Sequence, residues 1–294
     1  MIRKATLALF ILALSLRADA GIQEALRPDI VLQPTSATRI AAGSPAQTVR
    51  IPLPTLQEKE RWLQGIAFQP GDPRVVSSAF FYIDKTNQWL GGWVPGASMI
   101  MYPETVAALL PAGAKLILEI HYQSVDVDVN DLSSVGLYYI DRKPSRPLSG
   151  LGIETRVQIP PGGGELFRLR KEFTVISDSY ALALHPQMRS AARSLEVAAL
   201  DSTGAPLVLL ALKEIHGEEL PYVFEQPVFM PKGTRIVATA SYEGSQAQEI
   251  EDLFKLTMAI YPSDEFRAGA DPKPVVKRPA RRPVTKRAPA KKRP

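Results

Sequence analysis

Short runs in which apolar and polar residues alternate follow one another along most of the chain. They lie at 75–83, 115–122, 135–140, 180–184, 194–200, 207–212, 234–242 and 256–261, each bounded by Pro, Gly, Asn or Asp. Alternation with a period of two predicts half-buried β-strands, whereas helical periodicity is hard to find. Many short strands with turn signals between them favour a sandwich, a barrel or a jelly roll. The pattern therefore predicts an all-β chain.

A Pro- and Gly-containing stretch at 142–152 divides the body into two halves of near-equal length. In each half a Pro-x-Gly step introduces a strand, at 111–113 and at 231–233. Such turns are common, so they do not by themselves establish a duplication. The body of about 250 residues is long enough for one large β domain or two of ordinary size. We expect two tandem domains.

The first 20 residues have the composition of a signal peptide. Arg3 and Lys4 precede an apolar run at 5–16, and Ala18 and Ala20 flank the expected cleavage point. A bilayer span needs about 20 apolar residues, and Arg17 interrupts this run early. We expect an exported protein, periplasmic or secreted, without a transmembrane segment after cleavage.

The stretch 273–294 holds ten Lys or Arg, no acidic residue and a proline every few positions. Such a composition cannot form a core, which predicts a disordered tail. Without this tail and the signal peptide, 22 basic residues stand against 29 acidic ones, so the formal charge of +5 belongs to the tail. Nucleic-acid binding by the folded body is therefore not favoured. The chain has no cysteine, which excludes disulfides, thiolate catalysis and zinc–cysteine sites.

Several motifs of the first half stand in the order and spacing of a known family. They are R-W-L-Q at 61–64, P-G-D-P-R-V-V at 70–76, G-W-V-P-G at 92–96, L-P-A-G at 110–113, H-Y at 121–122 and D-L-S-S-V-G-L at 131–137. With them, this half resembles the N-terminal domain of bacterial relatives of the peptidylglycine α-hydroxylating and dopamine β-monooxygenases, which are copper type II, ascorbate-dependent enzymes.

The second half resembles the partner domain of the same family. Its motifs are I-P-P-G at 159–162, L-A-L-H at 182–185, L-D-S-T-G at 200–204, F-M-P-K-G-T at 229–234 and S-Y-E-G-S at 241–245. The resemblance covers roughly residues 55–262. It implies two antiparallel jelly-roll domains, each carrying one copper, that face each other across a solvent-filled cleft. One copper would receive electrons from ascorbate, and the other would bind oxygen and hydroxylate an aliphatic C–H bond.

Most of the copper ligands that the resemblance implies are missing. The first copper calls for two adjacent histidines where this chain has Ser77 and Ser78, and only its third histidine corresponds to a histidine here, His121. Hydroxyl groups are poor ligands for Cu(I), which prefers imidazole and thioether. By this comparison the first copper site lacks two of its three histidines.

The second copper calls for a His-x-His pair and a methionine. His185 supplies the first histidine, Gln187 stands in place of the second, and Met258 corresponds to the methionine. The residual copper candidates are thus His185, Met258, Gln187 and His121, and no catalytic residue is assigned. Each candidate also has a structural interpretation, which we favour. His121 follows an apolar strand, and Met258 shares its strand parity with Leu256.

These observations predict the following organisation. A signal peptide occupies 1–20, an N-terminal segment 21–54, a first β domain 55–147, a second β domain 148–265 and a disordered Pro/Lys/Arg-rich tail 266–294. The first functional hypothesis is a non-catalytic descendant of the monooxygenase fold that binds or assembles with a protein partner, without a cofactor. A second is an oxidoreductase with one residual copper at His185 and Met258. A third is a tether in which the basic tail binds an acidic surface polymer.

Overall fold

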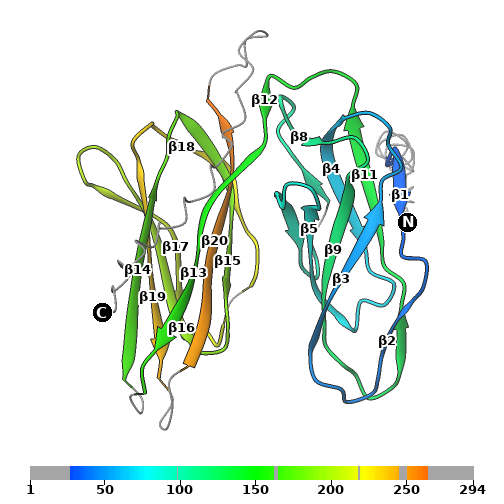
Figure 1. Cartoon of the computed structure of the whole chain (residues 1–294), viewed down its shortest axis with the longest axis horizontal. Helices are drawn as coiled ribbons and strands as arrows, with labels where there is room; N and C mark the ends of the chain where they lie inside the picture. Colours follow the sequence, from blue (N-terminus) through cyan, green and yellow to red (C-terminus); the bar gives the residue numbers. More distant parts are fainter. Residues whose placement is uncertain (1–26, 98, 162–164, 218, 245–249, 264–294) are drawn as a thin grey trace, which may run out of the picture.

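The computed structural model describes residues 27–97, 99–161, 165–217, 219–244 and 250–263. All regular elements in these ranges are β-strands, and no helix among them is long and apolar enough to cross a membrane. The strands form two sandwiches that lie side by side, joined by a single chain crossing (Figure 1). The expected signal peptide at 1–20 and the expected tail at 266–294 lie outside the described residues, so export and tail binding remain predictions.

The first sandwich contains eight principal strands in two sheets. Sheet I has the order β1-β11-β4-β8 and sheet II the order β3-β9-β5-β6. The bounds of these strands are β1 (Ile30–Leu32), β3 (Gln47–Pro54), β4 (Arg61–Gln69), β5 (Val76–Ile83), β6 (Trp89–Trp93), β8 (Val106–Leu110), β9 (Lys115–Tyr122) and β11 (Ser134–Ile140). Four short strands accompany them: β2 (Thr38–Ile40), β7 (Ile100–Met101), β10 (Val129–Asp131) and β12 (Arg146–Pro147). β2 pairs with β10, β7 with β4, and β12 with β8.

The second sandwich repeats this arrangement. Sheet III has the order β13-β20-β15-β18 and sheet IV the order β14-β19-β16-β17. The bounds are β13 (Ser149–Ile159), β14 (Leu166–Thr174), β15 (Ser179–Met188), β16 (Ala192–Leu200), β17 (Pro206–Lys213), β18 (Tyr222–Met230), β19 (Arg235–Glu243) and β20 (Ile250–Pro262). When the principal strands are counted along the chain, both sandwiches have the sheet orders 1-8-3-6 and 2-7-4-5. Each is therefore a complete eight-stranded jelly roll.

The predicted fold class, two tandem antiparallel jelly rolls, is confirmed. Residues 30–54, which the sequence-based division set apart as an N-terminal segment, form β1, β2 and β3 of the first jelly roll. β14 lies outside the predicted runs. Its alternation of exposed and half-buried residues is regular, but arginine, lysine and glutamate occupy many of its positions and hide the apolar face.

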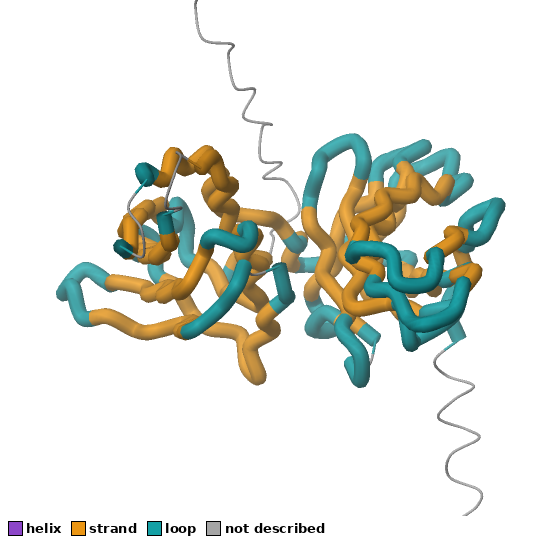
Figure 2. Tube along the Cα trace, turned by 90° about the horizontal axis from the view of Figure 1, so that it is seen from below, coloured by secondary structure: helices purple, strands orange, loops and turns teal. Residues whose placement is uncertain are grey.

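The four sheets are stacked in the order I, II, III, IV. One apolar core fills the space between sheets I and II, and a second fills the space between sheets III and IV. Ala183 of β15 and Tyr261 of β20 belong to the first cluster although their strands lie in sheet III, so the outer face of sheet III packs on sheet II. Seen from below, the two bodies meet along this joint (Figure 2).

Candidate functional site

Sheet II turns a row of large side chains toward sheet III. In the pairing of β5 with β9, Phe80 lies opposite Glu119 and Ser78 opposite His121, whereas Ala79 and Phe81 alternate with them and face the first core. Side chains alternate between the two faces of a strand, so Phe80, Glu119 and His121 share the outer face of sheet II. Phe80 and Glu119 are nevertheless buried, because the second jelly roll covers them.

On the opposite side of the joint, the outward-facing residues of β15 in sheet III pack against sheet II. A bulge between Ala181 and Ala183 changes the parity of this strand. After the bulge Leu184 faces the second core, and His185 therefore points out of the sandwich toward sheet II. The bulge thus decides that the histidine enters the joint.

His185 is an aromatic packing residue in this joint. Its side chain is 0% exposed, and its ring stacks on Phe80 with centroids 4.4 Å apart and an angle of 15° between the planes. Trp89 of β6 lies on it as well, at 4.9 Å. Neither ring nitrogen has a hydrogen-bond partner of good geometry in the described part of the chain. Burial lowers the pKa of His185 to about 3, because the apolar surroundings disfavour the charged ring. The ring is therefore neutral at pH 7.

His121 lies at the edge of the joint between two carboxylates. Its Nε2 is 3.4 Å from Glu119 Oε1, and its Nδ1 is 3.3 Å from Glu219 Oε2. Glu119 also lies 3.3 Å from Arg50 Nε. Burial alone would raise the pKa of Glu119, but the hydrogen bond from His121 and the charge of Arg50 outweigh burial and lower it. Since Glu219 precedes β18, this group of charges links the two jelly rolls.

Close packing of the backbone completes the joint. Gly92 of β6 faces Pro221, which lies just before β18, and an added Cβ would stand 2.9 Å from Pro221 Cγ and 2.7 Å from Phe80 Cδ1. A side chain at this position would push the two jelly rolls apart. Nearby, the hydroxyl of Tyr82 interacts with the side chain of Gln187, and burial raises the pKa of Tyr82.

The structure brings three of the four copper candidates to one place. His121, His185 and Gln187 all face the joint, whereas Met258 does not. Met258 lies opposite Leu184 in the pairing of β15 with β20, so it shares the core-facing side of the sheet with Leu184 and packs inside the second jelly roll. In the part of the chain that the structure describes, no group of three His, Asp or Glu side chains is arranged to hold a metal ion.

Sequence reasoning missed Phe80, Trp89, Glu119 and Glu219. A signal for the first of them exists. The strand 76–83 is apolar at both parities near its end, through Phe80, Phe81, Tyr82 and Ile83, and a strand that is apolar on both faces is one that is covered on both faces. Glu119 and Glu219 lie far apart in sequence, and only the docking of the two jelly rolls brings them to the same histidine.

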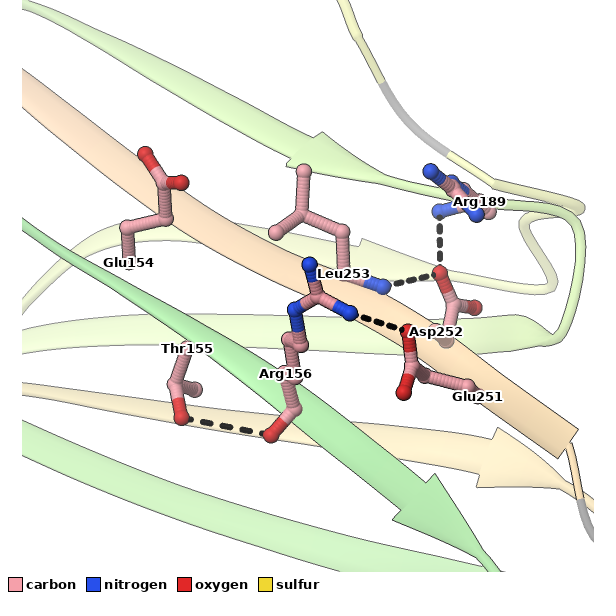
Figure 3. Close-up of a pocket in the computed structure, with 7 residues that line it drawn as sticks. All are labelled: Glu154, Thr155, Arg156, Arg189, Glu251, Asp252 and Leu253. Carbon is pink, nitrogen blue, oxygen red and sulfur yellow. Dashed lines mark hydrogen bonds and ion pairs between the residues drawn. The ribbon is translucent and has the colours of Figure 1, made fainter.

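A second polar site lies at one end of sheet III (Figure 3). It is an open pocket of about 480 Å³ lined by Glu154, Thr155, Arg156, Arg189, Glu251, Asp252 and Leu253. Asp252 is buried, and its Oδ1 accepts hydrogen bonds from the backbone N–H groups of Arg189 and Leu253 at 3.2 and 2.6 Å. Arg156 Nη1 donates to Glu251 Oε1 at 2.8 Å. These contacts hold the turn between β15 and β16 against β20, which is a structural role.

Comparison with known proteins gives no sequence relative. No family model matches the chain, and no curated protein matches it. Similar solved structures include the major capsid protein P2 from bacteriophage PM2, with 11% identity and a TM-score of 0.33 over 81% of this chain and 99% of that one. The MCP of STIV, the Sulfolobus turreted icosahedral virus, shows 9% identity and a TM-score of 0.32 over 79% of this chain and 96% of that one. An archaeal virus protein with a triple jelly roll shows 8% identity and a TM-score of 0.27 over 78% of this chain and 60% of that one.

The assignment to the copper type II, ascorbate-dependent monooxygenases is wrong. No family model matches the chain, and the similar solved structures named above are viral proteins with jelly rolls. The functions drawn from that assignment, an inactive descendant of the enzyme or an oxidoreductase with a residual copper, are withdrawn with it. At these identities and TM-scores the likeness concerns the jelly-roll fold alone, and nothing of the capsid proteins' function is carried over.

Proposed function

We propose that the chain is a structural protein in which two jelly rolls are locked face to face into one rigid block. The observation that carries this proposal is the state of His185, which is fully buried, neutral and stacked flat on Phe80. The three sequence-predicted site residues that meet at the joint pack the two domains together. A neutral imidazole between two aromatic rings acts as an apolar, flat side chain.

The energetics of the joint favour a fixed arrangement over a hinge. Burial of a side chain such as Phe80 contributes roughly 1.5–3 kcal/mol, and each aromatic pair adds about 0.5–1.5 kcal/mol beyond the area that it buries. Two such pairs meet at His185, and Tyr180 of β15 stacks on Tyr261 of β20 in the same sheet. Opening the joint would also expose Glu119 and separate His121 from Glu219. In a block of this kind the distance and orientation of sheet IV relative to sheet I are fixed.

The rigidity is measurable as a distance between the two outermost sheets. Because the chain has no cysteine, single spin labels can be placed through Val31→Cys on β1 and Glu196→Cys on β16, both exposed positions. Packed sheets lie about 10 Å apart, so three spacings predict a separation of roughly 30–40 Å. We expect a single narrow distance distribution by pulsed electron paramagnetic resonance, with labelled protein diluted into unlabelled protein.

The matched control carries both labels in the first jelly roll, at Val31 and Met101, both of which are exposed. Its distribution gives the width that the labels themselves contribute. A Val31–Glu196 distribution as narrow as that of the control supports the block. A broad or two-peaked distribution between the jelly rolls, with a narrow control, would overturn the proposed function.

A further inference from the structure

The lateral edges of the four sheets are protected to different degrees. In the first jelly roll β1 has three residues, β12 has two, and β3 contains Pro52 and Pro54, which cannot donate to a new strand. In the second, β14 carries charged residues along its length, β13 carries Glu154 and Arg156 near its middle, and β18 is interrupted where Pro227 lies between its two paired segments. Short strands, prolines and charges are the usual means of preventing edge-to-edge association.

β17, at the edge of sheet IV, has none of these protections. It is eight residues long, its only proline is its first residue, and its only charge is Lys213 at its end. Leu207 and Val208 are 53% and 54% exposed. β16 pairs with one side of β17, and no strand among the described residues pairs with the other. A long, apolar, unpaired edge strand is a template for another strand.

The partner of β17 can be inferred from which of its side chains point to the core and which point outward. Leu195, Val197 and Ala199 of β16 face the core, and Leu212, Leu210 and Leu207 lie opposite them on the same side of the sheet. Of these three, Leu210 and Leu212 pack on the core, whereas Leu207 lies at its margin and is 53% exposed. Val208, Ala211 and Lys213 take the outer side. A bulge at Leu209 produces this change of parity in the middle of the strand.

We infer that β17 pairs antiparallel with β17 of a second copy of this chain, around a twofold axis between Leu209 and Leu210. In that register Leu207 of one copy meets Leu212 of the other on the core side, and Val208 meets Ala211 on the outer side. Residues of the core side meet residues of the core side, and outer residues meet outer residues, because the bulge that changes the parity lies at the centre of the strand pair. Sheet IV then continues across the axis as one eight-stranded sheet.

The position of Lys213 explains why the pairing is antiparallel. In this register each Lys213 lies beside Pro206 of the other copy, and the two lysines stand at opposite ends of the strand pair. Parallel pairing in register would set Lys213 beside Lys213, and directly opposed like charges destabilise a sheet. Every apolar side chain between the two ends meets an apolar one. This inference rests on the proposed structural function and names its partner.

Register-specific crosslinking tests the pairing directly. Val208→Cys and Ala211→Cys are two separate variants of a chain that has no other cysteine. In the inferred dimer residue 208 of one copy opposes residue 211 of the other, within reach of a disulfide. The two residues 208 lie about 10 Å apart, which exceeds the Cα separation that a disulfide tolerates. We therefore expect disulfide dimers when the variants are co-expressed and oxidised, and few when either is oxidised alone.

Light scattering supplies the second measurement. The wild-type protein should be a dimer, and Val208→Lys should make it a monomer because two charges would enter the apolar strand pair. Val31→Lys is the matched control, an equally exposed valine on β1 that should leave the dimer intact.

A monomeric wild-type protein, equal crosslinking in the single and mixed samples, or an unchanged dimer in Val208→Lys would overturn the inference. The spin-label distance between sheets I and IV is measured within one copy. Failure of the dimer and failure of the rigid block are therefore separate results.

Discussion

Sheets II and IV hold the same place in their jelly rolls, with the strand order 2-7-4-5, but their outer faces differ. The outer face of sheet II carries Phe80, Tyr82 and Trp89, and all three are buried. The outer face of sheet IV carries Arg170 and Glu196, which are exposed. Topology alone therefore does not decide which sheet docks. The outward positions of the strands decide it.

The largest expected effect comes from removing the central side chain of the joint. Phe80→Ala should lower the free energy of unfolding by about 3–5 kcal/mol, the range for truncating a buried phenylalanine. Arg170→Ala on sheet IV is the matched control and should change it by less than about 0.5 kcal/mol. Urea denaturation measures both. Similar losses in the two variants would show that sheet II is no more tightly docked than sheet IV.

The second effect depends on pH. His185 has a folded-state pKa of about 3, well below the ordinary value of 6.5, so between these values the unfolded chain binds a proton that the folded chain excludes. Stability then falls as the pH falls, by about 2 kcal/mol between pH 7 and pH 5. His185→Phe keeps the stack on Phe80 and removes the titrating group. We expect this variant to lose about 2 kcal/mol less over that interval.

The comparison isolates His185 because its charged neighbours remain in both proteins. Glu119, His121 and Lys255 act on His185 electrostatically in the wild type. Against the effect of burial, the hydrogen bond from His121 and the charge of Arg50 lower the pKa of Glu119 below its ordinary value, and this group is present in both proteins. Equal pH slopes for the wild type and His185→Phe would contradict a buried, neutral histidine in the joint.

The smallest effect concerns the contact between His121 and Glu219 across the joint, which is an ion pair only when His121 is protonated. Glu219→Gln removes the carboxylate that faces His121 Nδ1 at 3.3 Å. Because Glu219 is 43% exposed, we expect a loss of about 0.2–1 kcal/mol at low salt that disappears at high salt. Glu172→Gln, in a surface pair with Arg235 on sheet IV, is the control. A salt-independent loss at position 219 would mean that packing, and not charge, is what this residue contributes.

Alternation along many of the strands predicted an all-β chain, and the family resemblance implied the two jelly rolls, although the assignment to that family is wrong. Most motifs of the family resemblance contain the residues that form tight turns. Pro111 O accepts a hydrogen bond from the backbone N–H of Ala114, and Pro231 O from that of Thr234, in two equivalent turns. The glycine of each turn has a positive φ, 62° for Gly113 and 92° for Gly233. Any β protein with such a turn selects the same residues, so these motifs are weak evidence of kinship.

The candidate site was only partly predictable, for a local and a long-range reason. His185 and Met258 lie on adjacent strands, but strand parity sends one side chain into the joint and the other into the core. That parity depends on the bulge in β15, which leaves no clear mark in the sequence. The burial of Phe80 and His185 depends on the docking of one sandwich on the other, which the pattern of a single strand does not encode.

The most direct test of the central claim is whether the two jelly rolls unfold together. All three tryptophans, Trp62, Trp89 and Trp93, lie in the first jelly roll, so tryptophan emission reports that domain and, through Trp89, its joint with the second, whereas far-ultraviolet circular dichroism reports both domains throughout. A rigid block predicts coincident urea transitions by the two signals in the wild type. Two separate midpoints in the wild-type protein would contradict it.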